Sequence, residues 1–337
     1  MATTLLVLVP VAVVLAVGAG AVAVSPAHVV EIVRHHLTGS VPDVPAAEDQ
    51  IVWAVRVPRV LLAFVTGAGL AVAGATLQAV VRNPLADPYV LGVSAGASAA
   101  AVVVLTTGVG GGIAGGVAGG LGVSGAAFCG GLLTLGLVLL LGRQHGRVDP
   151  TRLLLAGVAL GYLFQAVTSY LQLRQGGAKL QAVLFWLLGT VASAQWSSLW
   201  LPAALVAVCT GWLIVRARTL DALVLGDEVA ASLGLRAGWL RVQLLVVAAL
   251  LTAAVIAVAG GVGFVGLVAP HAVRLLVGTG HRLLLPLAAL AGGVFLVLAD
   301  LVGRTAAPPV ELPLTVVTAV AGVPFFLVLL RRGGART

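Results

Sequence analysis

Two membrane-length apolar runs joined by one polar hinge constrain this chain more than any other feature of its sequence. The first run covers residues 57–81, which exceeds the roughly 20 residues that an α-helix needs to cross the hydrocarbon core of a bilayer. The second run opens at Val90 and continues to about Thr107. The hinge at 82–88 holds two prolines, two charged residues and an asparagine, which favour a turn at the membrane surface over a continued lipid-exposed helix. The stretch therefore predicts a helical hairpin in a membrane protein.

The rest of the chain has the composition of a membrane-embedded helix bundle. Hydrophobic residues make up 60% of it and charged residues only 9%, whereas about 25% charged is ordinary in a soluble domain. The 44 glycines allow helices to approach closely, which favours their association where lipid supplies no hydrophobic drive between them. We predict an all-α polytopic membrane protein with a single transmembrane domain over residues 1–337.

Ten apolar runs separated by charges, prolines or glycine clusters are candidate transmembrane helices. They cover approximately 4–24, 57–81, 91–107, 117–142, 152–172, 196–215, 239–259, 262–277, 283–303 and 313–330. The break between the seventh and eighth runs is the weakest, because only the segment 260–263 marks it. About ten spans place the two termini on the same side of the membrane.

The positions of arginine and lysine orient these spans, because basic loops are retained in the cytoplasm more often than they are translocated. If both termini are cytoplasmic, the inner loops hold thirteen of the 19 basic residues. The outer side then holds the other six, which are Arg34, Arg56, Arg59, Arg174, Lys179 and Arg304. The bias predicts that both termini are cytoplasmic. Scattered singly between apolar runs, these residues do not indicate a nucleic-acid partner.

Two segments are too polar to span a membrane. Residues 25–52 contain several acidic residues and prolines, and predict an outer loop with a short helix around His28 to Leu37. Residues 216–238 predict two short cytoplasmic helices separated at Gly226. We expect Asp227 to be the N-cap of the second helix and Gly234 to be its C-cap.

The chain lacks the motifs of a membrane-embedded enzyme. Its apolar runs contain no pair of carboxylates and no HExxH sequence. A phosphate-binding P-loop needs a lysine followed by serine or threonine, yet the only lysine, Lys179, precedes Leu180. We therefore expect no cofactor in this chain. If it is a pump, ATP and Mg²⁺ belong to a separate ATPase subunit.

Metal ligands are not apparent in the sequence either. Cys129 and Cys209 lie inside apolar runs and have no partner at metal-ligand spacing. His35 and His36 fall in the polar outer segment, where we expect them to be solvated. The sequence therefore predicts no metal site.

Two other classes of membrane protein remain as alternatives to a pump. An ion-gradient-coupled secondary transporter usually places ionisable groups deep in its spans, whereas Asp300 is almost alone here. A non-transporting membrane scaffold is the second alternative, which only a measurement of flux separates from a transporter.

Polar residues at helical spacing mark one face of the run 152–172. Gln165, Ser169 and Gln172 lie on it, and Gln78 on the run 57–81 is a candidate to face the same space. A polar stripe in a membrane helix needs either hydrogen-bond partners on other helices or water. Helix association and the lining of a translocation pathway are therefore both open interpretations.

Several motifs resemble the permease subunits of type II ABC importers for ferric siderophores, haem and cobalamin. The segment 56–97 contains RVPR, GAGLAVAGATLQ and NPLADPYVLGVSAGA. In order along the chain follow RLLLAGVALG at 152–161, GFVGLVAPHAVRLL at 263–276, HRLLLP at 281–286 and ELPLTVVTAVAGVPFFLVLL at 311–330. The resemblance implies a subunit of ten helices in the cytoplasmic membrane, paired in a homodimer with the pathway along the dimer axis.

The resemblance also implies partners and the residues that meet them. Two ATP-binding cassette subunits supply the ATPase, and an extracytoplasmic substrate-binding protein docks on the outer side. Docking is implied for Arg56, Arg59 and Arg304, where exposed complementary charges would raise the association rate and fix the register. The residues implied for the cytoplasmic gate are Asn83, Leu85 and Thr151.

Coupling to the ATPase is implied for the segment 219–236, which is similar to the coupling helices of ABC permeases. The candidate contact residues are Leu223, Leu225, Gly226, Asp227, Glu228, Ala230, Leu233 and Gly234. A short rigid element of this kind can transmit closure of the ATPase as a rigid-body shift. For the cargo, the resemblance favours a ferric siderophore first, and haem or cobalamin next.

Overall fold

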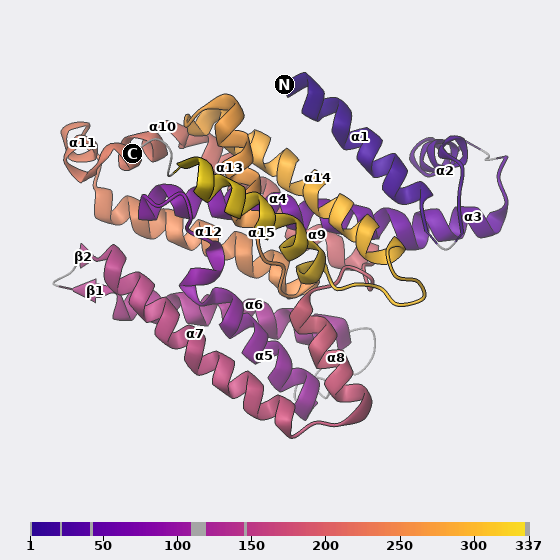
Figure 1. The fold of residues 1–337 in the computed structure, drawn as a ribbon, viewed down its shortest axis with the longest axis horizontal. Coiled ribbons are helices and arrows are strands. Elements are labelled where there is room, and N and C mark those ends of the chain that lie inside the picture. Colours follow the sequence, from indigo (N-terminus) through magenta and orange to yellow (C-terminus); the bar gives the residue numbers. More distant parts are fainter. Residues whose placement is uncertain (1, 21, 41–42, 109–118, 145–146, 334–337) are drawn as a thin grey trace.

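The computed structural model describes residues 2–20, 22–40, 43–108, 119–144 and 147–333, and in these ranges the chain is nearly all helical (Figure 1). A two-residue antiparallel ladder, in which β1 pairs with β2, is the only strand structure described. The elements are α1 (Ala2–Gly18), α2 (Pro26–Thr38), α3 (Ala46–Gln50), the π-helical turn η1 (Ile51–Arg56), α4 (Val57–Val81), the 3₁₀ turn η2 (Pro88–Leu91), α5 (Val93–Thr107), α6 (Gly119–Leu141), β1 (Arg143–Gln144), β2 (Arg147–Val148), α7 (Pro150–Leu173), α8 (Gly177–Leu188), α9 (Trp196–Val215), α10 (Ala217–Leu225), α11 (Asp227–Ser232), α12 (Ala237–Ala259), α13 (Val265–Val277), α14 (His281–Thr305) and α15 (Leu314–Gly333).

Each of the ten predicted runs coincides with a helix, which confirms the all-α membrane fold. Six helices among the described residues are long and apolar enough to cross a bilayer. The runs at 4–24, 91–107, 262–277 and 313–330 correspond to the shorter helices α1, α5, α13 and α15. The first run was predicted too long, because α1 ends at Gly18, whose carbonyl accepts a hydrogen bond from the backbone of Val24 at 3.1 Å.

Helix α4 is the centre of the bundle. It packs against α14, α12, α13 and α9, and nearly all its side chains are buried. Small residues allow the closest approaches, because a Cβ placed on Gly67 would overlap the backbone of Gly292 in α14, and one on Gly74 would overlap that of Gly266 in α13. Such contacts give helices in lipid the dispersion energy that replaces a hydrophobic drive.

The central helix continues well beyond the predicted span. Residues 46–81, comprising α3, η1 and α4, form one apolar helix of 36 residues. Pro58 lies just after the π turn, whose widened hydrogen-bond pattern accommodates a residue without a backbone N–H inside the continuous helix. At a rise of 1.5 Å per residue, this helix is about 54 Å long, which exceeds the roughly 30 Å hydrocarbon core.

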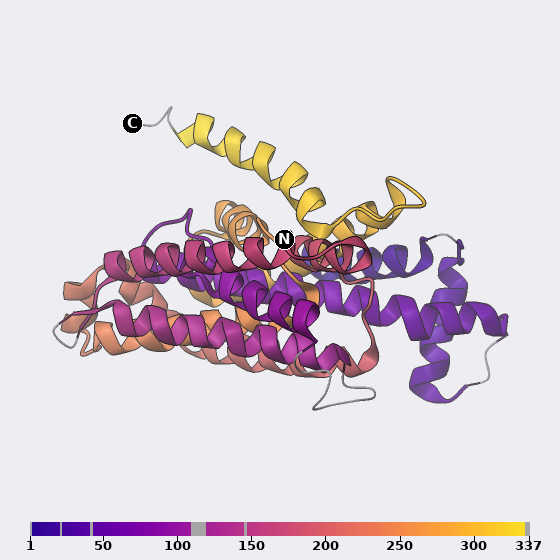
Figure 2. The ribbon, with the colours of Figure 1, turned by 90° about the horizontal axis from the view of Figure 1, so that it is seen from below.

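The remaining helices form two groups around this axis. Helices α5 to α8 lie together on one side and α13 and α14 lie on the other, while α12 packs between α4 and α6 (Figure 1). The pair α2–α3 and the pair α10–α11 lie at opposite ends of the long axis in both ribbon views. Helix α15 leans away from the body of the bundle (Figure 2).

The two polar segments fold mainly as predicted. In the segment 25–52, the predicted helix is α2, which Ser25 caps by accepting the N–H of His28 at 3.2 Å. The second polar segment breaks at Gly226, as expected, into α10 and α11. Gly234 follows α11 with a φ of +76° and donates its N–H to the carbonyl of Ala231, which confirms the predicted helix stop.

One capping prediction was wrong. Asp227 is the first residue of α11, and Gly226, with a φ of +125°, is the N-cap. The carboxylate of Asp227 is bound by Arg82 and Arg241 instead. Because the Asp227 carboxylate pairs with these two arginines, its side chain does not cap the helix.

Candidate functional site

A buried ionic cluster joins three segments at the α2–α3 end of the bundle. Arg59 of α4 donates from Nε and Nη2 to Asp300 of α14, with the shortest distance 2.8 Å, and from Nη1 and Nη2 to Glu311 at 3.0 and 2.8 Å. Asp300 is only 2% exposed, whereas the side chain of Glu311 is 43% exposed. The hydrogen bonds from Arg59 lower the pKa of the Glu311 carboxyl below its ordinary value.

Two further arginines bind the end of α1. Arg56 donates from Nη1 to the carbonyls of Val17 and Gly18 at 2.9 and 3.0 Å. Arg304 donates to the carbonyl of Ala16 and also lies 3.6 Å from Asp300. The last carbonyls of a helix lack partners within the helix and carry partial negative charge, so both guanidinium groups stabilise this end.

The three arginines implied in docking are therefore brought together at one end of the bundle, with their side chains largely buried. Arg59 and Arg304 both form ion pairs with Asp300. Arg56 and Arg304 both donate hydrogen bonds to backbone carbonyls at the end of α1. Each is already engaged inside the chain. Docking of a binding protein on them remains a prediction.

At the other end, the segment 219–236 presents a mixed surface. Leu220, Leu223 and Ala230 are fully buried, so they hold the segment against the bundle. Leu225 is 71% exposed and Leu233 is 64% exposed. Gly234 and Glu228 are exposed as well. The exposed members of the predicted set are thus available to a partner. Leu223 and Ala230 are buried within this chain, so a partner cannot contact them as the chain is folded here.

Two carboxylates fasten this segment to the spanning helices. Asp227 accepts hydrogen bonds from Arg241 of α12 at 2.6 and 2.8 Å and from Arg82, which follows α4. Asp221 of α10 lies 2.6 Å from Nδ1 of His281, the first residue of α14. Helices α4, α12 and α14 are therefore each tied to the segment by a charged or polar contact.

A cavity of about 490 Å³ opens beside these contacts. Polar groups on its wall include Gln78, Arg82, Asp221, Arg274 and His281. Gln78 donates to the carbonyl of Gly266 at 3.3 Å and accepts from Arg274 at 2.9 Å. The predicted pathway residue Gln78 is thus already hydrogen-bonded within the wall of this cavity.

Two of the predicted gate residues, Asn83 and Leu85, lie in the turn after α4, and Thr151 is the second residue of α7. After α4, Arg82 has a φ of +54°, and the side chain of Asn83 accepts the N–H of Leu85 at 2.9 Å. Burial raises the pKa of Asp87 in the same turn, although the N–H of Tyr89 donates to it. At the start of α7, Asp149 is the N-cap and accepts the N–H of Arg152 at 2.9 Å. Leu85 and Thr151 are exposed.

The polar stripe of α7 faces outward. Gln165 and Ser169 are exposed, and Gln172 is half-buried. In the apolar stretch of α7 that could span a membrane, only 17% of the residues are buried within the chain. Gln78 lies in the central helix, so the structure does not join it to this stripe in one space.

Comparisons with known proteins agree with this architecture. A protein family described as "FecCD transport family" matches residues 6–332 of the chain. The chain belongs to the FecCD transport family. It is therefore a member of the family of ABC importer permeases that its motifs resemble, and the predicted resemblance is confirmed.

Several FecCD relatives are similar over most of their length. The cobalamin import system permease protein BtuC of Halobacterium salinarum is 40% identical over 86% of this chain and 75% of the relative. The vitamin B12 import system permease protein BtuC of Vibrio cholerae is 43% identical over 85% and 84%. The hemin transport system permease protein HmuU of Yersinia pestis is 38% identical over 82% of each.

A solved structure extends the FecCD likeness to three dimensions. An ABC transporter assigned to the metal-chelate type, in an inward-facing conformation, matches 98% of each chain with a TM-score of 0.84 and 30% identity.

The partners of the charged residues in this FecCD chain could not be inferred from the sequence. Asp221, Arg241 and His281 lie far from one another in the sequence, and no local spacing indicates that they hold the segment 219–236.

Proposed function

We propose that this chain is the transmembrane permease subunit of an ATP-driven importer that moves a metal chelate across the cytoplasmic membrane by alternating access. The observation that carries the proposal is the segment 219–236, which is exposed to a partner yet fastened to three spanning helices. Membership of the FecCD transport family supports it over 327 of the 337 residues, from 6 to 332.

The mechanism follows from how this segment is held. A separate ATP-binding cassette subunit, which binds ATP and Mg²⁺, meets the exposed side chains of Leu225, Glu228 and Leu233. When the two ATPase subunits close, α10 and α11 move with them. The contacts of Asp227 and Asp221 carry this shift to α4, α12 and α14, as a rigid-body movement of packed helices.

A second copy of the chain completes the pathway in this proposal. Helix α7 exposes Gln165 and Ser169 beside apolar residues, and lipid alone offers such polar groups no hydrogen bonds. The outward faces of α7 and α15 are the surfaces that a homodimer would cover. The pathway then lies between the two copies, with the α7 stripe along it.

Orientation and docking belong to the same proposal. The arginine bias supports cytoplasmic termini and places α10–α11 inside and α2–α3 outside. An extracytoplasmic binding protein then meets the end that holds Arg56, Arg59 and Arg304. Glu311 is the exposed member of the cluster there, so an acidic partner would compete with it for Arg59.

The cargo is proposed as a class of metal chelate. Ferric siderophore, haem and cobalamin are its members, and the relatives quoted above are named for cobalamin, vitamin B12 and hemin. Selection among these chelates rests in this proposal with the binding protein. Cobalamin and ferric siderophore are the first two cargoes to test.

Proteoliposomes containing this chain, its ATPase and its binding protein test the transport proposal. We expect ATP-dependent accumulation of one radiolabelled chelate among ferric siderophore, haem and cobalamin. Flux that follows a proton or sodium gradient without the ATPase would instead establish the secondary transporter. Absence of ATP-dependent flux of all three chelates contradicts the proposal and favours the scaffold.

A charge reversal tests the coupling segment directly. Glu228→Arg should leave ATP hydrolysis in place but reduce chelate uptake, because it reverses the charge on the surface offered to the ATPase without touching the bundle. Lys179→Glu is the matched control, since it reverses an exposed charge on α8, away from the segment. Normal uptake by Glu228→Arg would overturn the role of this segment.

A further inference from the structure

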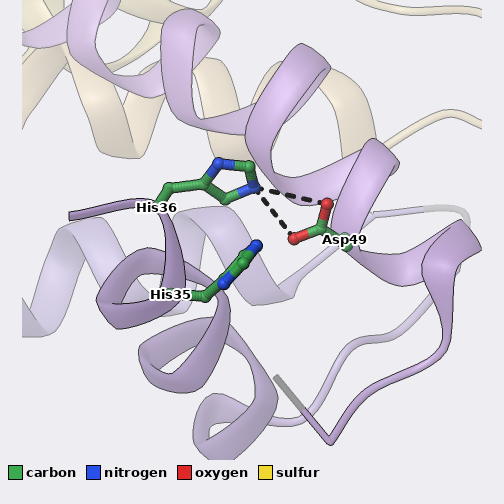
Figure 3. Close-up of side chains that lie close together, drawn as sticks. All are labelled: His35, His36 and Asp49. Atoms are coloured by element: carbon green, nitrogen blue, oxygen red, sulfur yellow. Dashed lines mark hydrogen bonds and ion pairs between the residues drawn. The ribbon is translucent and has the colours of Figure 1, made fainter. Parts of the chain in front are cut away.

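A cluster of three potential metal ligands lies at the α2–α3 end, away from the segment that couples to the ATPase. His35 and His36 come from α2 and Asp49 comes from α3 (Figure 3). One ligand atom from each lies within 4.8 Å of the other two. We propose that these three side chains form a binding site for a divalent transition-metal ion of the Zn²⁺ class.

Two of the ligands are already in contact. Nε2 of His36 lies 3.0 and 3.3 Å from the two carboxylate oxygens of Asp49. Ligands that hold one tetrahedral Zn²⁺ at its usual bond lengths are about 3.3 Å apart, so this pair has the right separation. His35 has to move closer by roughly an ångström, which a small change of its side-chain torsion angles can supply, since the residue is only half-buried.

Neighbouring groups orient both imidazole rings. Nδ1 of His35 is hydrogen-bonded to the carbonyl of Ser40, which fixes the tautomer and leaves Nε2 with its lone pair free. That nitrogen points toward Asp49 in Figure 3. The ring of His36 stacks on Trp53 with 4.2 Å between centroids and 3° between planes. Bound metal ligands in proteins commonly have such outer partners.

The donor set indicates which ions fit. Two imidazole nitrogens and one carboxylate oxygen suit Zn²⁺, Cu²⁺ or Ni²⁺, whereas Ca²⁺ and Mg²⁺ require mainly oxygen ligands. Three protein ligands leave one coordination position for water. Hydrogen bonding between His36 and Asp49 alone would not explain why His35 is also aimed at the carboxylate.

The same end of the molecule provides an internal control. His28 and Glu48 form a second histidine–carboxylate pair, 2.7 Å apart, about two turns earlier on α2 and one residue earlier on α3. No third histidine, cysteine or carboxylate joins this pair to form a metal-binding group among the described residues. The sequence predicts that His35 and His36 are solvated, and only the folding of α2 against α3 distinguishes the two pairs.

A bound ion would have a defined structural effect. It would link α2 to α3, where the 36-residue helix begins. Trp53, which lies on that helix, contacts Trp196 of α9 with 4.8 Å between ring centroids. The ion would therefore fasten the outer helix α2 to the central helix and α9.

The test is a titration of the full chain, purified without a polyhistidine tag and embedded in nanodiscs. Isothermal titration with Zn²⁺ should give one ion per chain, and Co²⁺ should give the visible absorption of a site with nitrogen ligands. His36→Gln and Asp49→Asn should each weaken binding at least 10-fold, since losing even an outer-shell partner costs 10–100-fold. His28→Gln should bind as the wild type does.

The outcomes decide the proposal. Thermal unfolding without metal must first show that each variant is folded. If Asp49→Asn does not fold, His35→Gln, which changes a half-buried ring on α2, provides a second test. Equal binding by wild type and His36→Gln overturns the site, as does equal weakening by His28→Gln. Failure of the wild type to bind Zn²⁺ or Co²⁺ overturns it as well.

Discussion

The two carboxylates that Arg59 holds should differ sharply in what they contribute to stability. In Asp300→Asn, the buried guanidinium groups of Arg59 and Arg304 lose the charge that faces them both. Breaking a buried ion pair by neutralising one partner costs about 3–5 kcal/mol, because an uncompensated charge remains. In Glu311→Gln, the lost carboxylate is nearly half exposed, and a pair of this kind contributes about 1 kcal/mol or less.

Both substitutions remove one negative charge opposite the same guanidinium, so each is the control for the other. The assay is equilibrium unfolding of the full chain in mixed micelles with increasing dodecyl sulfate, followed by the loss of helical circular dichroism. Asp300→Asn should lower the free energy of unfolding by at least 2 kcal/mol more than Glu311→Gln, the smallest difference between the two ranges. Equal losses would refute the argument that burial sets the strength of this cluster.

Two more predictions concern packing and pH. Gly74→Ala should lower the free energy of unfolding by about 1–3 kcal/mol, because the added methyl overlaps the backbone of Gly266, whereas Gly211→Ala, with open space around it, should be neutral or stabilising in the same titration. Arg59 lowers the pKa of Glu311 below 4.5, the ordinary pKa of a glutamate carboxyl. The Arg59–Glu311 ion pair should therefore stabilise the fold fully above pH 4.5, and less as the pH falls through the lowered pKa. The difference in unfolding midpoint between wild type and Glu311→Gln should therefore shrink below pH 4.5; a constant difference contradicts the pairing.

The helices could be predicted because each apolar run is bounded by residues that end helices. Residues 82–88 end α4 with a proline-containing turn, and the apolar run predicted at 283–303 matches α14 within two residues at each end. Helix α8 was missed, since it has only 12 residues and begins within the stretch of charges and glycines at 174–179. The continuity of 46–81 was missed as well, because Glu48, Asp49 and Pro58 mark the edge of an apolar run without ending the helix.

The contacts of the candidate sites could not be predicted, because they join distant parts of the chain. Arg59 lies 241 positions from Asp300 and 252 from Glu311. The family motifs located these arginines without indicating that they are paired internally. In the segment 219–236, the spacing found two helices, but the burial of Leu223 depends on how α10 packs against α4 and α14.

The 36-residue helix has a mechanical consequence. At one end it is followed by Arg82, which Asp227 of the segment 219–236 holds, and at the other it carries Asp49 and Trp53. Between them, its glycines contact the backbones of α13 and α14 directly, and α9 and α12 pack against it as well. A helix enclosed in this way cannot tilt independently of its neighbours. Any displacement of its Arg82 end must therefore displace the packed helices with it as one rigid body.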